Sequence, residues 1–148
     1  MPYVRLALLG LTACASLSYA QGTLIASTLR RDHAFDATGS TLYLTTSQGR
    51  LNLYDAASTT LTSSFSVGQS LLGMDITPDV ATAFIAGREV AGSFGLVRRV
   101  DLATGQTTSL AYPRAFGENY TWDIVMVSNE RGFVTTTYAG SGSTPLRE

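Results

Sequence analysis

The sequence predicts an all-β fold, built from repeated four-stranded sheets that stack as the blades of a β-propeller. The first observation is that, from residue 31 onward, short segments rich in β-branched and aromatic residues alternate with turn residues such as Gly, Pro, Asp and Ser. The second is that similar segments recur at offsets of 41, 46 and 48 residues. A period of roughly 40 to 50 residues with four short strands per unit is typical of a propeller blade.

The first copy of the repeat follows a lead-in of residues 21–31, of which residues 23–26 can pair as a strand. Apolar and polar residues alternate most clearly over residues 51–55 (LNLYD), which is the period of a half-buried strand. Glycines and short polar runs supply the turns. The strands predicted after the lead-in are Thr41–Thr46, Leu51–Asp55 and Leu61–Val67.

The second copy begins within residues 66–84, where one strand ends at Gly68 and a Pro-Asp turn follows the next strand. Residues 87–94 predict a longer inner loop than the corresponding residues 47–49. A third copy opens at WDI, residues 122–124, which matches MDI in the second copy. The strands predicted in these two copies are Leu71–Ile76, Ala83–Ala86, Val97–Asp101, Thr107–Tyr112, Trp122–Ile124 and Phe133–Tyr138.

These copies place blade 1 at about residues 31–68, blade 2 at about 69–113 and a partial blade 3 at about 120–148. Neighbouring blades are expected to stack into a continuous apolar core, because one sheet cannot cover both of its own faces. About two and a half blades are fewer than the four or so that a closed propeller needs, and the sequence is expected to end where the third strand of blade 3 begins. We therefore predict an incomplete propeller: a truncated reading frame, a ring of self-associated copies or an atypical small fold.

Several of these segments resemble the bacterial YVTN-type β-propeller repeat. Residues 43–46 and 51–55 stand where that family has its YVTN and VSVID strands, and residues 65–68 and 73–79 stand where it has T-I-P-V-G and G-V-A-V-S-P-D-G. The resemblance covers about residues 36–138 in fragments and implies the propeller fold without naming a ligand. The sequence departs from the family pattern at Val80, which replaces a Gly, and at residues 128–132, which replace the Ser-Pro-Asp-Gly turn.

Composition excludes several classes of function. The formal net charge is −1, so the chain has no excess of basic residues to neutralise nucleic-acid phosphates. All ten basic residues are Arg, which excludes a Schiff-base lysine and a phosphate-loop lysine. His33 is the only histidine and Cys14 the only cysteine, so a His/Cys zinc site and an intrachain disulfide are excluded as well. We predict no cofactor.

Residues 1–20 are predicted to be a secretory signal peptide. Arg5 precedes an apolar run, residues 6–17, that is too short to span a bilayer as a helix. Small residues before the predicted cleavage site after Ala20 complete the pattern. A second alternative is that residues 11–14 (LTAC) resemble a bacterial lipobox, in which case Cys14 is lipidated and anchors the protein to a membrane. Both alternatives predict an exported protein, periplasmic or extracellular.

The candidate site residues are carboxylates on predicted inner strands. Asp75 and Asp123 occupy equivalent repeat positions, and such carboxylates can line a propeller's central channel and contact a ligand or cation. The alternative is that they hold the backbone by hydrogen bonds, as we expect for Asp55 and Asp101 at the ends of strands. His33 lies in a polar cluster before the first clear strand, where a lone imidazole has no catalytic partner.

No catalytic constellation is evident, so the sequence predicts a non-catalytic exported propeller that offers loops for binding a protein or a small ligand. The partner would otherwise be the missing blades or further copies of the chain; neither nucleic acid nor, without lipidation, a membrane is expected. The alternative function is an N-terminal piece of a periplasmic propeller enzyme, lactonase-like or quinoprotein-like. The residues of such enzymes are spread over several blades, so missing blades would have to supply them.

Overall fold

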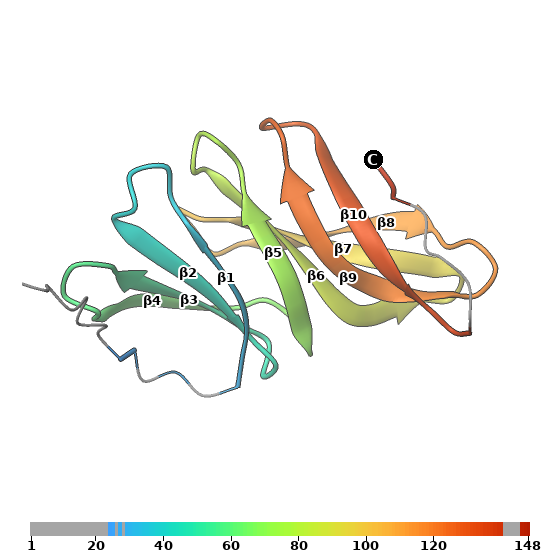
Figure 1. The fold of residues 1–148 in the computed structure, drawn as a ribbon, viewed down its shortest axis with the longest axis horizontal. Coiled ribbons are helices and arrows are strands. Elements are labelled where there is room, and N and C mark those ends of the chain that lie inside the picture. The colour runs from blue at the N-terminus through green and yellow to red at the C-terminus, as the bar shows by residue number, and fades with distance from the viewer. Residues whose placement is uncertain (1–23, 26, 28, 141–145) are drawn as a thin grey trace, which may run out of the picture.

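The computed structural model describes residues 24, 25, 27, 29–140 and 146–148, and these residues contain strands and no helix (Figure 1). The all-β prediction is therefore confirmed. None of the described residues belongs to a helix long and apolar enough to cross a membrane. The predicted signal peptide, including Cys14, lies outside the described residues. The strands are β1 (Arg30–Phe35), β2 (Thr41–Thr46), β3 (Arg50–Asp55), β4 (Leu61–Ser66), β5 (Leu71–Ile76), β6 (Thr82–Ala91), β7 (Phe94–Asp101), β8 (Thr107–Pro113), β9 (Glu118–Met126) and β10 (Gly132–Tyr138).

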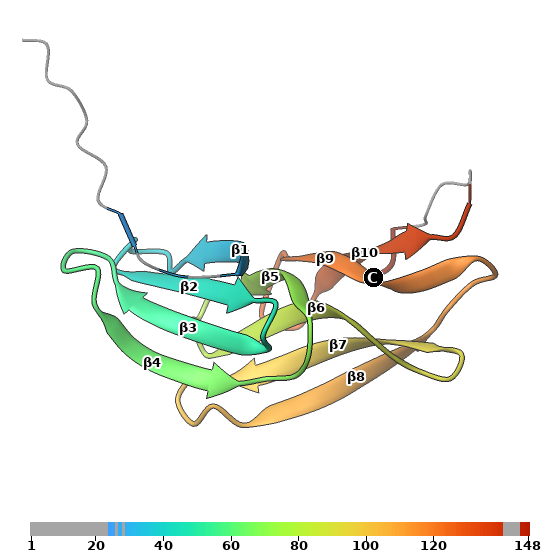
Figure 2. The ribbon, with the colours of Figure 1, turned by 90° about the horizontal axis from the view of Figure 1, so that it is seen from below.

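The strands form three antiparallel sheets, each made of strands that follow one another in sequence. The first sheet has the order β1-β2-β3-β4, the second β5-β6-β7-β8, and the third contains β9 and β10. The sheets stand side by side along the molecule, in chain order (Figures 1 and 2). This arrangement is compatible with two four-stranded propeller blades and part of a third.

Two predictions about the strands are wrong. β1 lies where the sequence predicts a lead-in, because its polar residues carry little β-propensity and become a strand by pairing with β2, with Phe35 opposite Leu42. The predicted inner loop of residues 87–94 is instead a continuation of β6 and β7, which turn at Gly92 and Ser93. Gly92 has a φ of +59°, which suits a tight hairpin turn.

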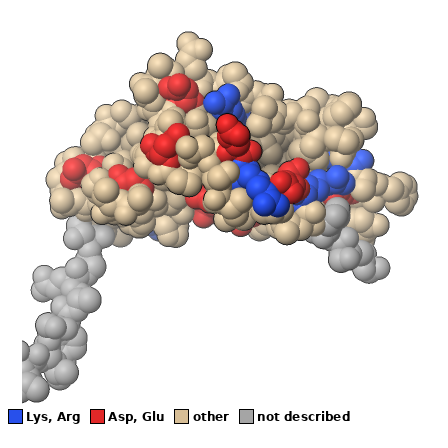
Figure 3. All heavy atoms as spheres, turned by 90° about the horizontal axis from the view of Figure 1, so that it is seen from above, with Lys and Arg blue, Asp and Glu red and all other residues tan. Residues whose placement is uncertain are grey.

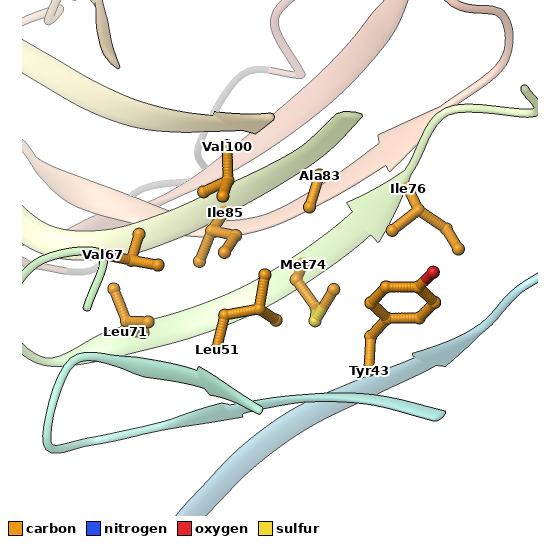
Figure 4. Packing of buried hydrophobic residues seen from close by; sticks show 9 residues of the cluster. All are labelled: Tyr43, Leu51, Val67, Leu71, Met74, Ile76, Ala83, Ile85 and Val100. Atoms are coloured by element: carbon orange, nitrogen blue, oxygen red, sulfur yellow. The ribbon is translucent and has the colours of Figure 1, made fainter. Parts of the chain in front are cut away.

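A continuous apolar core fills the space between the first two sheets (Figure 4). Leu51 from the first sheet and Ile85 and Val100 from the second are fully buried. Burying one such side chain contributes about 1.5–3 kcal/mol relative to leaving it exposed. The buried members of this core are Tyr43, Leu51, Val67, Leu71, Met74, Ile76, Ala83, Ile85 and Val100.

The contact between the second and third sheets has a smaller apolar core and more buried polar groups. Its buried apolar residues are Val97 from the second sheet and Ile124 and Val134 from the third. Thr121 is fully buried beside them and donates a hydrogen bond to the carbonyl of Leu96, with 2.8 Å between the oxygens. A buried hydroxyl needs such a partner, so hydrogen bonding decides how these two sheets meet.

Residues 146–148 return to the third sheet after the stretch that is not described. Arg147 forms an antiparallel bridge with Val134 on β10, through two backbone hydrogen bonds of 2.8 and 3.1 Å. Val134 lies opposite Ile124, and the corresponding residue of the second sheet, Ala83, pairs with Val100 on its third strand. Arg147 therefore occupies the third-strand position, and the prediction that the sequence ends where this strand begins is wrong.

Four aspartates follow strands and close turns: Asp36, Asp55, Asp79 and Asp101. At Asp55 the carboxylate oxygen Oδ1 accepts a hydrogen bond from the backbone N–H of Ser58, at 2.7 Å. Hydrogen bonds of this kind hold the pKa of each of the four carboxyls below its usual value, although in Asp36 burial works in the opposite direction. The turn role expected for Asp55 and Asp101 is confirmed.

Val80 explains one departure from the family pattern. It follows Asp79 in the turn between β5 and β6 and has a φ of +58°. That left-handed conformation suits Gly, which the YVTN-type repeat has at this place, and is strained for a β-branched residue. Val80 also packs against the apolar core between the first two sheets, so its side chain gains burial while its backbone is strained.

Candidate functional site

The innermost strands of the three sheets, β1, β5 and β9, are joined by carboxylate contacts. Asp32 Oδ2 on β1 accepts a hydrogen bond of 2.7 Å from the backbone N–H of Met74 on β5. Asp75 Oδ2 on β5 accepts one of 2.7 Å from the backbone N–H of Met126 on β9. Both carboxylates bridge one sheet to the next, so these two aspartates have a structural role.

The two predicted channel-lining residues differ in their surroundings. Asp75 is half-buried and its carboxylate is used in the contact with β9. Asp123 is exposed on β9 and lines a shallow hollow of about 210 Å³ together with Asp32, Arg31 and Trp122. The structure thus brings Asp123 together with Asp32, and Asp75 is not among the residues that line this hollow.

His33 lies exposed in the middle of β1, on the side of the first sheet that faces away from the second. It borders a hollow of about 440 Å³ with Arg30, Phe35 and Leu42. Within the described residues, no three His, Cys, Asp or Glu side chains gather closely enough to hold a metal ion.

The best-formed hollow is a groove between the second and third sheets. Its volume is about 340 Å³, and apolar side chains make most of its wall. Leu110 and Tyr112 on β8 form one side, Ile124 and Val134 on β9 and β10 form the other, and Arg147 lies at the third-strand position. An apolar cleft with a few polar groups is the usual form of a ligand site.

A charged pair closes one end of this groove. Glu118 on β9 is buried, and Arg147 donates to both of its carboxylate oxygens, at 2.6 and 3.1 Å. Thr136 and the backbone N–H of Ala115 also donate to Glu118, at 3.0 and 2.6 Å. The guanidinium of Arg147 stands 5.7 Å from the ring centre of Tyr112, within the range of a cation–π contact. These contacts join the third sheet to the second.

The protonation states of this pair follow from the same contacts. Burial raises the pKa of Glu118, but the hydrogen bonds from Arg147, Ala115 and Thr136 together lower it below its usual 4.5. Burial raises the pKa of Tyr112, whose hydroxyl lies 2.8 Å from Thr121 Oγ1. At neutral pH the groove therefore contains an ionised Glu–Arg pair and an uncharged phenol.

Sequence reasoning did not identify Glu118, Arg147 or Tyr112. Glu118 and Arg147 are 29 residues apart and neither belongs to a local motif, so no sequence signal pairs them. Elsewhere on the surface, acidic and basic side chains alternate without a large area of one sign (Figure 3), which agrees with the near-neutral net charge.

No family model and no curated protein sequence matches this chain. Among solved structures, the chain is similar to hydrazine synthase from Kuenenia stuttgartiensis, with a TM-score of 0.60 and 20% identity over 80% of this chain and 32% of that one. It is also similar to the structure of U3-55K, with a TM-score of 0.59 and 10% identity over 78% of this chain and 34% of that one. The matched part thus spans about a third of either protein. Both have β-propeller-type folds, and at these identities the likeness concerns the fold alone.

Proposed function

We propose that this chain is an exported, non-catalytic module of the YVTN-type propeller class, which binds a protein or small ligand in the groove between its second and third sheets. The observation that carries the proposal is the groove itself, an apolar cleft whose only charged wall groups near β10 include the paired Glu118 and Arg147. Export is supported by the signal-like pattern of residues 1–20 and the repeat class by the segments around residues 43–79.

The roles of the carboxylates support a non-catalytic module. A general acid or base needs a carboxyl that is free to exchange a proton with a substrate. Asp55 and Asp101 accept hydrogen bonds within turns, and Asp32 and Asp75 accept backbone N–H groups of a neighbouring sheet. Glu118 is held by Arg147. Each of these groups therefore stabilises the fold.

The groove also has a chemical preference. Its wall is mainly apolar, and the side chain of Arg147 remains about a quarter exposed beside Tyr112. An aromatic or aliphatic group would bury apolar surface against Leu110 and Val134. A negative charge on the same ligand would lie near Arg147, so the favoured ligand is apolar and carries an acidic group.

Titration with anilinonaphthalene sulfonate, an aromatic anion, tests the groove. We expect saturable binding and backbone chemical-shift changes at Leu110, Tyr112 and Val134. Leu110→Arg should abolish this binding, because Leu110 lines the groove and is 47% exposed. The matched control is Leu61→Arg on β4, where the Leu is 53% exposed and lies away from the groove; this variant should bind as the unmodified chain does. Binding that survives Leu110→Arg, or no saturable binding, would overturn the proposed site.

Export is tested separately by cell fractionation and the intact mass of the recovered chain. We expect the protein in an exported fraction, with Gln21 as its first residue. A mass that corresponds to a lipidated Cys14 would identify a membrane anchor in place of cleavage after Ala20. A cytoplasmic chain that retains residues 1–20 would contradict export.

A further inference from the structure

The contact between neighbouring inner strands occurs twice within the chain. In the first, Asp32 on β1 accepts the backbone N–H of Met74 on β5, and in the second, Asp75 on β5 accepts that of Met126 on β9. The donor–acceptor distance is 2.7 Å in both. Each sheet thus offers a carboxylate to the inner strand of the sheet that follows it.

Asp123 presents the same group at the end of the series. Like Asp75, it uses Oδ1 to accept the backbone N–H of its own following residue, at 2.9 Å in both cases. At Asp75 the second oxygen, Oδ2, binds the next inner strand. In the part of the chain that the structure describes, Oδ2 of Asp123 has no hydrogen-bond donor, and the residue is exposed. Asp123 is therefore oriented to receive a further strand.

The surface around Asp123 has the character of the faces that are buried elsewhere in the molecule. Val134 and Ile124 face the second sheet, so their neighbours Phe133 and Val125, which pair across β10 and β9, point to the opposite side. Val125 is 50% exposed, and Phe133 is only partly buried. This far face of the third sheet is apolar and lacks a covering sheet among the described elements.

The far face of the first sheet is its chemical counterpart. Phe35 is 52% exposed there and borders the hollow of about 440 Å³ that Leu42 also lines. Ile25 packs near the centre of this face, and Arg30 and His33 lie exposed on β1 at the hollow. An acidic group on one end of the molecule thus matches basic side chains on the inner strand at the other end.

We propose that a second copy of this chain docks head to tail, with the far face of its first sheet against the far face of the third sheet. Asp123 Oδ2 of one copy accepts a backbone N–H from β1 of the other, which repeats the contacts of Asp32 and Asp75. Two copies carry six sheets, within the range of about four to eight blades found in closed propellers. The two equivalent contacts close such a pair, so growth stops at the dimer.

The native mass of the purified chain, measured by light scattering and sedimentation, tests this proposal. We expect a dimer that Asp123→Asn weakens at least about tenfold, since a hydrogen bond to a charged group is lost. This variant retains Oδ1 for the N–H of Ile124, while its new amide group opposes an incoming N–H donor. Glu130→Gln, a charge-removing control in the turn between β9 and β10, should leave the mass unchanged.

Val125→Arg provides a second disruption of the same face and should also produce monomers. A circular-dichroism melt of each variant shows whether the monomer is folded. A monomer at every concentration, or a dimer that persists in both Asp123→Asn and Val125→Arg, would overturn the proposal. Leu110→Arg affects the ligand groove on the other side of the third sheet and should leave the dimer intact, so failure of either proposal is distinguishable from failure of the other.

Discussion

The two contacts between neighbouring sheets are built from different interactions. Between the first and second sheets, a continuous core includes the fully buried Leu51, Ile85 and Val100. Between the second and third sheets, the apolar core is smaller, and the buried Glu118 and Thr121 are satisfied by hydrogen bonds. The first contact depends mainly on burial of apolar surface, whereas the second also depends on the charge of one carboxylate.

This difference teaches how a repeated architecture can give unequal neighbours. Burial of apolar surface is insensitive to pH and tolerates sliding between similar side chains. Buried hydrogen bonds require particular partners and leave a large cost when one partner is removed. We therefore expect the first two sheets to form the stable part of the molecule, and the third sheet to be the part that responds to pH and to local substitutions.

Leu51→Ala is expected to have the largest effect, because it removes a fully buried side chain from the first contact. We expect the free energy of unfolding to fall by about 2–5 kcal/mol, measured by urea denaturation. The control is Leu61→Ala on β4, where the Leu is half exposed; its cost should be within about 0.5 kcal/mol. Equal costs at the two positions would contradict the importance of the first core.

Glu118→Gln is expected to destabilise the second contact by about 1.5–3 kcal/mol at neutral pH, since it removes the charged partner of Arg147. The pKa of Glu118 is lowered in the folded protein, so the unfolded chain binds a proton more readily. Its contribution is therefore present above the usual pKa of 4.5 and is lost as the pH falls through the lower folded value.

Denaturation curves across this acid range measure that dependence. The unmodified chain should lose stability as the pH falls, and Glu118→Gln should lose less over the same interval. The turn aspartates, whose pKa values are also lowered, will contribute the same background slope to both proteins. Identical pH profiles would show that Glu118 does not supply the pH dependence of this contact.

Gly73→Ala tests how closely the second and third sheets approach. A Cβ at Gly73 on β5 would lie 2.7 Å from Asp123 Cα on β9, so the strands would have to separate. We expect a loss of about 1–3 kcal/mol, as in other overpacked positions. Gly87→Ala on β6 is the matched control, since its Cβ would meet no atom closer than 3.6 Å. Hydrogen exchange at β9 should increase in the first variant and remain unchanged in the second.

Much of the strand arrangement could be predicted from the sequence, because the signals are local. The bounds of β2 and β5 agree with the predicted Thr41–Thr46 and Leu71–Ile76. Both segments combine β-formers with a clear turn at one end. β1 was not predictable in the same way, since RRDHAF is polar and becomes a strand through its neighbour β2.

The candidate site could not be predicted from the same signals. The groove depends on how two sheets meet, and Glu118 finds Arg147 across 29 residues through the return of the chain to β10. For the inner strands, the equivalence of Asp75 and Asp123 was visible from the repeated MDI and WDI segments. Which of them is used inside the chain depends on the presence of a following inner strand, and only β5 has one among the described residues.

The succession of hairpins has a consequence for how the chain acquires its structure. Every sheet is assembled from consecutive strands, so the pairing partner of each strand has left the ribosome or a translocation pore shortly before it. Such local connectivity favours rapid formation, since little chain entropy is lost in closing each loop. The β1–β4 sheet can therefore form while later residues are still emerging, and its face can serve as the template on which the β5–β8 sheet collapses.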